Sequence, residues 1–123
     1  MSSKSIKKIA SELSSINGVD AVYLFGSHAT GKQKPYSDID ICVVTDSPIT
    51  QDERSEILAT SSKKIDIHIL SDLPLYIQFR VFRDGRLLLV NSQQALLRAR
   101  VEVVKRYLDF QHRLQKYYGR ILS

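Results

Sequence analysis

Aspartates interrupt two segments that are otherwise strongly apolar. Residues 38–44 read Asp-Ile-Asp-Ile-Cys-Val-Val, and residues 64–70 read Lys-Ile-Asp-Ile-His-Ile-Leu. Short runs of this kind, rich in β-branched residues and partly alternating, predict β-strands. Residues two apart in a strand face the same side of the sheet, so Asp38 and Asp40 are expected to project together. The fold must therefore provide a partner for charges carried on strands.

The other segments predict helices and strands in alternation. Apolar residues recur at helical spacing in residues 3–16, and Asn17-Gly18 is a plausible left-handed stop for that helix. Further strands are predicted at residues 21–25 and 87–90, and helices at 51–61, at 73–82 and along the C-terminal segment. These elements predict an α/β (α+β) fold, with a small mixed β-sheet flanked by helices and a long C-terminal helix.

Composition is that of an ordinary globular protein. The 123 residues are 43% hydrophobic and 25% charged, and we expect one domain spanning residues 1–123. The single cysteine, Cys42, lies in an apolar run and is expected to be a small core residue in a reducing compartment. No signal peptide or membrane span is predicted, so we expect a cytoplasmic protein without membrane contact.

Positive charge is concentrated near the C-terminus. Residues 92–123 hold seven basic and two acidic side chains, a difference that equals the net charge of the whole chain, +5. Such a helix could attract nucleic acid or an acidic partner protein, or it could be an ordinary solvated face.

The strand aspartates point to metal chemistry. Two like charges on an apolar strand are costly unless a cation lies between them. Oxygen ligands without cysteine or a histidine cluster favour Mg²⁺, with Mn²⁺ as the alternative, and Mg²⁺ is commonly shared with substrate phosphates. Asp66 is a third acid of this kind, so the three carboxylates could hold two ions. Asp66 is also our candidate to orient or deprotonate an attacking hydroxyl.

Gly26 and Ser27 follow the first predicted strand directly. A glycine there allows the backbone to approach a phosphate, and the serine adds a hydroxyl donor. Either motif alone has an ordinary explanation, because a Gly-Ser pair is usually a turn and an Asp-x-Asp is usually solvated. The combination of Gly26-Ser27, ten intervening residues, the Asp38-x-Asp40 pair and Asp66 is far more specific for an enzyme site.

The motif around these residues resembles the signature of the DNA polymerase β-type nucleotidyltransferase superfamily. The likeness runs from Leu24-Phe25-Gly26-Ser27 to Ser37-Asp38-Ile39-Asp40-Ile41, and it extends to Asp66-Ile67-His68, the 80–85 stretch and the last helix. The small size resembles the minimal members, the MNT or MntA-like antitoxins.

The resemblance implies a polymerase β-like fold with Asp38 and Asp40 as ligands of two Mg²⁺ ions and Asp66 as the third carboxylate. Gly26 and Ser27 would hold the triphosphate of ATP. Relatives often carry arginines just after this pair, and here Lys32 or Lys34 could take their place as point charges.

For function, the resemblance implies an adenylyltransferase that acts as the antitoxin of a toxin-antitoxin pair. It would transfer AMP from ATP to a tyrosine of a HEPN-domain ribonuclease toxin, with which it forms a hetero-oligomer. Two alternatives remain open, which are adenylylation of a small molecule such as an aminoglycoside and neutralisation of a partner by binding alone. Direct nucleic-acid binding is not expected, because the chain is too small to grip a template duplex.

His68 lies two positions after Asp66 and is expected to share its face. It could donate a hydrogen bond to a metal-binding carboxylate, or it could be a partly buried strand histidine with a local partner. Tyr107, Tyr117 and Tyr118 of the last helix are expected to be packing residues or partner contacts.

Overall fold

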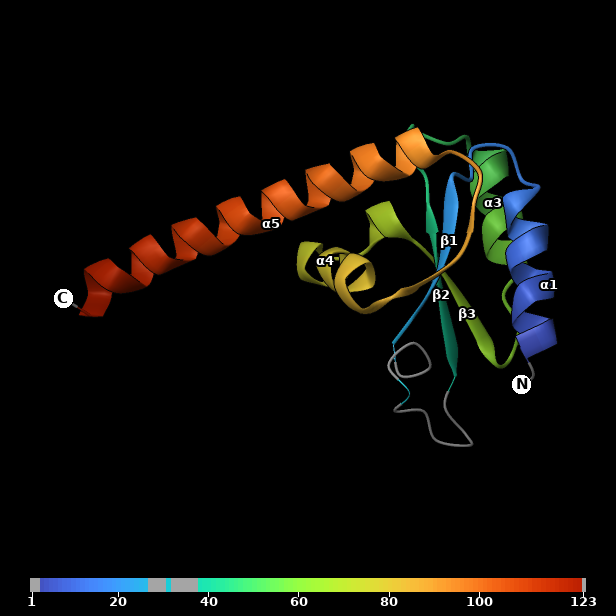
Figure 1. Cartoon of the computed structure of the whole chain (residues 1–123), viewed down its shortest axis with the longest axis horizontal. Helices are drawn as coiled ribbons and strands as arrows, with labels where there is room; N and C mark the ends of the chain where they lie inside the picture. Colours follow the sequence, from blue (N-terminus) through green and yellow to red (C-terminus); the bar gives the residue numbers. More distant parts are fainter. Residues whose placement is uncertain (1–2, 27–30, 32–37, 123) are drawn as a thin grey trace.

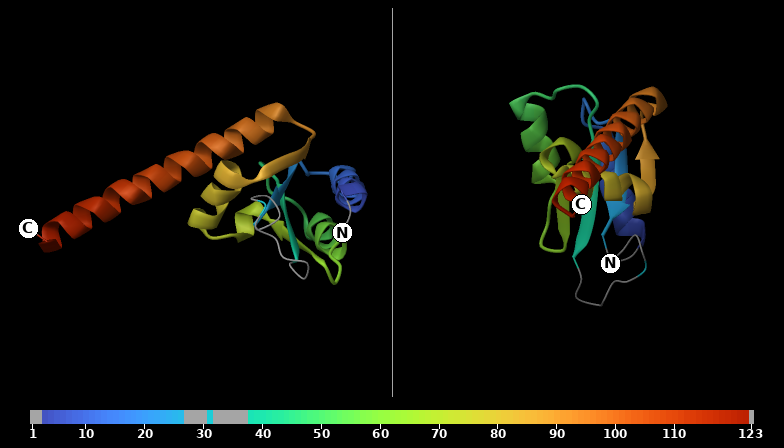
Figure 2. Two further views of the ribbon diagram at one scale, coloured as in Figure 1. Left: turned by 60° about the horizontal axis from the view of Figure 1, so that its bottom comes forward. Right: turned by 90° about the vertical axis from the view of Figure 1, so that its left-hand side faces the viewer.

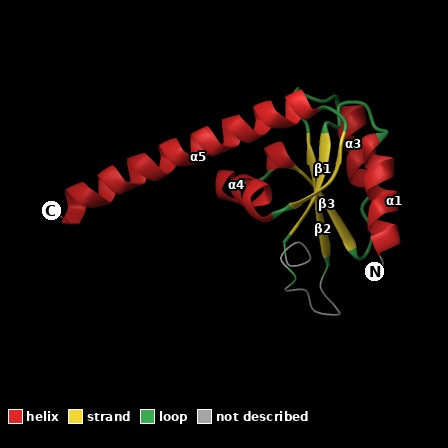
Figure 3. Cartoon of the chain, viewed as in Figure 1, coloured by secondary structure: helices red, strands yellow, loops and turns green. Residues whose placement is uncertain are grey.

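The computed structural model describes residues 3–26, 31 and 38–122. It confirms the predicted order of helices and strands (Figures 1 and 3). The elements are α1 (Ser3–Ser14), β1 (Ala21–Phe25), β2 (Ile39–Val44), α3 (Gln51–Ala59), β3 (Ile65–Ile69), the 3-10 helix η1 (Leu70–Asp72), α4 (Leu75–Asp84), β4 (Arg86–Val90) and α5 (Gln93–Leu122).

The strands form one mixed sheet in the order β3-β2-β1-β4. β1 pairs antiparallel with both β2 and β4, whereas β2 and β3 run parallel. A parallel pair requires a crossover between its strands, and α3 provides it. Thr50 caps α3, since its hydroxyl accepts from the backbone N–H of Glu53 while the Glu53 side chain accepts from the N–H of Thr50. The predicted mixed sheet flanked by helices is thus confirmed.

Strand alternation gives the sheet two buried faces. One face carries Ile39, Ile41 and Val43 and packs with residues of α1 and α3. The other carries Cys42 and Val44 and packs with residues of α4 and α5. The helices accordingly lie on opposite sides of the sheet in Figures 1 and 2. The predicted core position of Cys42 is confirmed, and burial raises the pKa of its thiol, which keeps it protonated.

Element boundaries differ slightly from the sequence predictions. β2 begins at Ile39, so Asp38 precedes the strand by one residue. α4 begins two residues later than predicted and ends at Asp84. Gly18 adopts a left-handed conformation with φ +95° in the turn after α1, as the sequence predicted. None of the helices in the described ranges combines the length and apolar character needed to span a bilayer.

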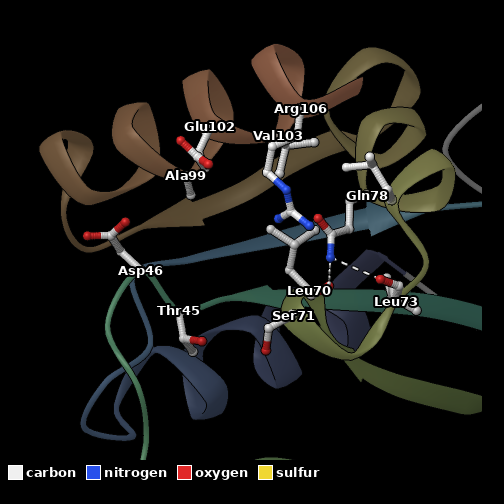
Figure 4. A pocket seen from close by; sticks show the side chains of 11 residues that line it. Thr45, Asp46, Leu70, Ser71, Leu73, Gln78, Ala99, Glu102, Val103 and Arg106 are labelled. Atoms are coloured by element: carbon white, nitrogen blue, oxygen red, sulfur yellow. Dashed lines mark hydrogen bonds between the residues drawn. The ribbon is translucent and has the colours of Figure 1, made fainter. Parts of the chain in front are cut away.

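A buried glutamine connects α4 to the 3-10 helix η1, which follows β3. The Nε2 of Gln78 donates to the carbonyl oxygens of Leu70 and Leu73, both at 2.9 Å, as the dashed lines in Figure 4 mark. Gln78 is the buried polar residue of the described chain, and these bonds satisfy two carbonyls that would otherwise meet an apolar environment. The bonds fix the face of α4 that covers the sheet.

We expect Gln78→Leu to lower the free energy of unfolding by about 1–3 kcal/mol, because two carbonyls lose their donor in a buried site. Tyr76→Leu, at an exposed position of the same helix, should change it by less than about 0.5 kcal/mol. Urea denaturation followed by circular dichroism measures both values. Equal stability of the two variants would contradict this role of Gln78.

Candidate active site

The register of the parallel strands brings two of the predicted acids together. Asp40 of β2 is paired with Asp66 of β3, and neighbouring residues of paired strands point to the same face. Both acids lie on the face that α4 and α5 cover, since Ile39, Ile41, Ile65 and Ile67 occupy the opposite one. Asp40 is half-buried and Asp66 is exposed. The two carboxylates therefore meet at a solvent-accessible edge of the sheet.

A histidine completes this group. Asp40, Asp66 and His68 each offer one ligand atom within 4.8 Å of the others. The Nε2 of His68 lies 3.4 Å from Oδ1 of Asp40. Phe25 of β1 supports the imidazole from the side, with ring centroids 5.4 Å apart and an interplanar angle of 73°. Phe25 on β1 and Asp40 on β2 thus both contact the imidazole of His68.

The environment of Asp40 disfavours its negative charge. Burial raises the pKa of the Asp40 carboxyl, and repulsion by Asp66 and Asp38 raises it further, while His68 opposes the shift. The net direction is upward, so an ionised Asp40 gains from a nearby positive charge. A bound cation would supply this positive charge.

Gly26 lies directly against the Asp40 carboxylate. It has a left-handed backbone with φ +77°, and a Cβ added there would lie 2.8 Å from Oδ2 of Asp40. A side chain at this position would therefore be strained and would also displace the carboxylate. The glycine is required both by the turn after β1 and by the space that Asp40 occupies.

The other predicted site residues have different places. Asp38 is exposed, and it is near enough to Asp40 to raise its pKa by charge repulsion. The tight group of three contains His68 and not Asp38. Ser27, Lys32 and Lys34 lie outside the described residues.

The carboxylates lie at the opposite end of the sheet from a separate polar cavity. This cavity of about 320 Å³ lies between α5, η1 and the residues that follow β2, among them Thr45 and Asp46 (Figure 4). Asp40 is near the start of β2, whereas Thr45 follows its last residue. The cavity is therefore distinct from the group formed by Asp40, Asp66 and His68.

The donor set of the group suits a divalent cation. Two carboxylates and an imidazole converge within 4.8 Å, and burial makes the charge of Asp40 costly without a counter-ion. Carboxylate oxygens are the ligands that Mg²⁺ and Mn²⁺ prefer, and an imidazole can either ligate the ion or orient a carboxylate that does. The residues present thus fit a metal held by Asp40 and Asp66.

Sequence reasoning only partly anticipated two contacts of the group. Alternation placed His68 on the face of Asp66, but its approach to Asp40 depends on the pairing of β3 with β2. Phe25 was noted only as part of the motif that carries the resemblance, and its contact with His68 had no sequence signal, because an aromatic residue at the end of a strand is ordinarily a core residue.

Comparison with known proteins places these features in a family. Residues 6–94 match the family described as polymerase beta, nucleotidyltransferase. Over 70 residues the chain is 34% identical to a protein of Methanocaldococcus jannaschii named as a candidate protein adenylyltransferase, a match that covers 57% of this chain and 55% of that protein. The chain thus spans about half the length of this relative.

Solved structures share the fold over the whole length. A crystal structure of a toxin-antitoxin with AMP-PNP contains a similar chain, with a TM-score of 0.72, 23% identity and coverage of 100% of both chains. A complex of tri-AMPylated HEPN toxin with MNT antitoxin from Shewanella oneidensis contains another, with a TM-score of 0.64, 21% identity and coverage of 98% and 95%.

The family match includes every element of the sheet and all the acids described above. It spans more than half of the chain, from α1 to the start of α5. On this ground, the chain belongs to the polymerase beta-type nucleotidyltransferase family.

Proposed function

We propose that this chain is a Mg²⁺-dependent adenylyltransferase that transfers AMP from ATP to a tyrosine of a cognate HEPN toxin and thereby acts as its antitoxin. The observation that carries the proposal is the pairing of Asp40 with Asp66 across parallel strands, beside the left-handed Gly26. This arrangement places two acids where a nucleotide phosphate could reach a metal that they bind.

The similar proteins support this choice of reaction and partner. The solved structures include a toxin-antitoxin with AMP-PNP and a tri-AMPylated HEPN toxin in complex with MNT antitoxin. The relative from Methanocaldococcus jannaschii carries a name in which the acceptor of the adenylyl group is a protein. A protein tyrosine is therefore our proposed acceptor, in preference to a small molecule.

The proposed reaction is a single displacement at phosphorus. The tyrosine oxygen attacks the α-phosphorus of ATP, the bond from that phosphorus to the bridging oxygen breaks, and pyrophosphate leaves. Asp66 is exposed, so its carboxylate is accessible to the incoming hydroxyl and can accept its proton. The transferred group is then held on the tyrosine as an AMP ester.

The residues of this chain divide the remaining tasks. Asp38, Asp40 and Asp66 would hold two Mg²⁺ ions, or Mn²⁺ in their place, which when bound neutralise phosphate charge and activate the attacking hydroxyl. His68 orients the Asp40 carboxylate through its contact at 3.4 Å. Gly26 leaves room for that carboxylate, and Ser27, Lys32 and Lys34 are proposed to bind the triphosphate.

Asp40→Asn and Asp66→Asn should each abolish AMP transfer while the fold survives, because each removes charge that binds the metal without adding bulk. The measurement is incorporation of label from α-³²P-ATP, in the presence of Mg²⁺, into a HEPN protein that forms a complex with this chain. Asp52→Asn, at an exposed acid on α3, is the matched control and should retain transfer. Full transfer by either site variant, or labelling of an aminoglycoside in place of the protein, would contradict the proposal.

Gly26→Ala should lower the rate of AMP transfer by about 100-fold, because the new Cβ would force the Asp40 carboxylate out of position. Gly31→Ala tests backbone strain alone, since Gly31 has a similar φ of +75° but nothing lies within 4 Å of an added Cβ. Single-turnover rates at saturating ATP distinguish the two. Comparable losses in both variants would mean that strain, and not displacement of Asp40, causes the effect.

A further inference from the structure

Helix α5 carries an apolar seam with the spacing of a coiled coil. Its members alternate at four- and three-residue steps over nearly three heptads, and they are Val103, Tyr107, Phe110, Leu114, Tyr117 and Ile121. This is the a and d pattern with which one helix packs along another. The seam is thus longer than an ordinary contact between a helix and a small sheet requires.

Only the first part of the seam is covered by the rest of the described chain. Val103 is buried in the core on the α4 side of the sheet, and Tyr107 stacks on Phe79 of α4 with ring centroids 4.0 Å apart and 5° between the planes. Farther along, Phe110 is 46%, Tyr117 59% and Ile121 58% exposed. Figures 1 and 2 show this C-terminal half of α5 projecting beyond α4 and the sheet.

The spacing of the open seam specifies the shape of its occupant. A seam with a strict period of 3.5 residues fits another helix that crosses at a shallow angle, about 20°, better than it fits a sheet or a loop. Residues 108–122 of α5 correspond to about 22 Å of helix at 1.5 Å per residue. An occupant would need about two heptads of its own to cover this length.

The residues beside the seam specify the charge of the occupant. Arg106, Arg113 and Arg120 recur every seven residues along one flank, and Gln111 and Tyr118 lie on the other flank. No acid stands at these flanking positions of the described helix. Two copies packed antiparallel would set arginine against arginine, and two parallel copies would set arginine against the uncharged flank. The flanks therefore fit a helix with acidic residues and disfavour self-pairing.

We propose that the open part of the seam, Phe110 to Ile121, is the docking site for an amphipathic helix of a partner protein whose flanks are acidic. The inference rests on the proposed function only for the identity of that partner, which is then the HEPN toxin. The apolar seam supplies the contact area, and Arg113 and Arg120 select a partner with complementary charge. The proposed docking site is thus on α5, whereas the carboxylates Asp40 and Asp66 are on β2 and β3.

The combined variant Tyr117→Glu and Ile121→Glu should weaken the complex with the HEPN protein by more than about 100-fold, because it places charges in the apolar interface. Leu108→Glu is the matched control, since Leu108 is equally exposed, at 57%, but lies off the seam. Titration calorimetry measures both affinities on the full chain. Equal affinity of the two variants would overturn the proposal.

Charge reversal tests the flank separately. Arg113→Glu with Arg120→Glu should slow association with the HEPN protein at low salt, and the difference should shrink as salt is added. Lys116→Glu with Lys105→Glu makes the same change in net charge at positions away from the seam and should have the smaller effect. Equal effects of the two double variants on the association rate would contradict the claim that Arg113 and Arg120 select the partner.

Other occupants give different results. Dimerisation of the chain alone in sedimentation, abolished by the seam variant, would overturn the proposal in favour of a second copy. Seam-dependent binding to vesicles of phosphatidylglycerol would overturn it in favour of a membrane surface. Binding of a non-hydrolysable ATP analogue should be unchanged in the seam variant. Conversely, the Asp66→Asn variant should dock the HEPN protein normally, so failure of docking and failure of AMP transfer are distinguishable.

Discussion

Asp40 and Asp66 face each other because β2 and β3 pair in parallel and in register, and most other features of the molecule serve that pairing. α3 returns the chain from the end of one strand to the start of the next, and its capping box fixes where that return begins. The apolar residues that alternate with the acids are themselves buried against residues of α1 and α3. Burial of apolar side chains on the opposite side of the same strands thus offsets the free-energy cost of bringing two like charges together.

The fold was largely predictable from local sequence. Alternation in residues 38–44 and 64–70 indicated strands, and helical spacing indicated the surrounding helices, because each pattern follows from where side chains point along one element. The acids were recognisable as site candidates since charge is rare in such apolar strands. The start of β2 was misplaced by one residue, because Asp38 continues the alternation of the sequence although it lies just before the strand.

Contacts between elements were not predictable in the same way. His68 approaches Asp40, and Phe25 approaches His68, only through the register of three strands that are distant in sequence. The helix α5 poses the same difficulty along its length. Val103 and Phe110 are both apolar seam residues, yet one is buried and the other is half exposed. Phe79 of α4 stacks on Tyr107, which lies between these two residues in the seam, so the part of α5 that α4 covers decides between them.

The projection of α5 has an evolutionary consequence. Phe110, Tyr117 and Ile121 of the open seam already contact water, so replacing one of these apolar side chains by another costs little folding stability. Replacement of Gly26 is tolerated far less, because the Asp40 carboxylate fills the space that a side chain at this position would need. Substitutions that alter what the seam can bind are therefore tolerated more easily than substitutions that alter the carboxylate site.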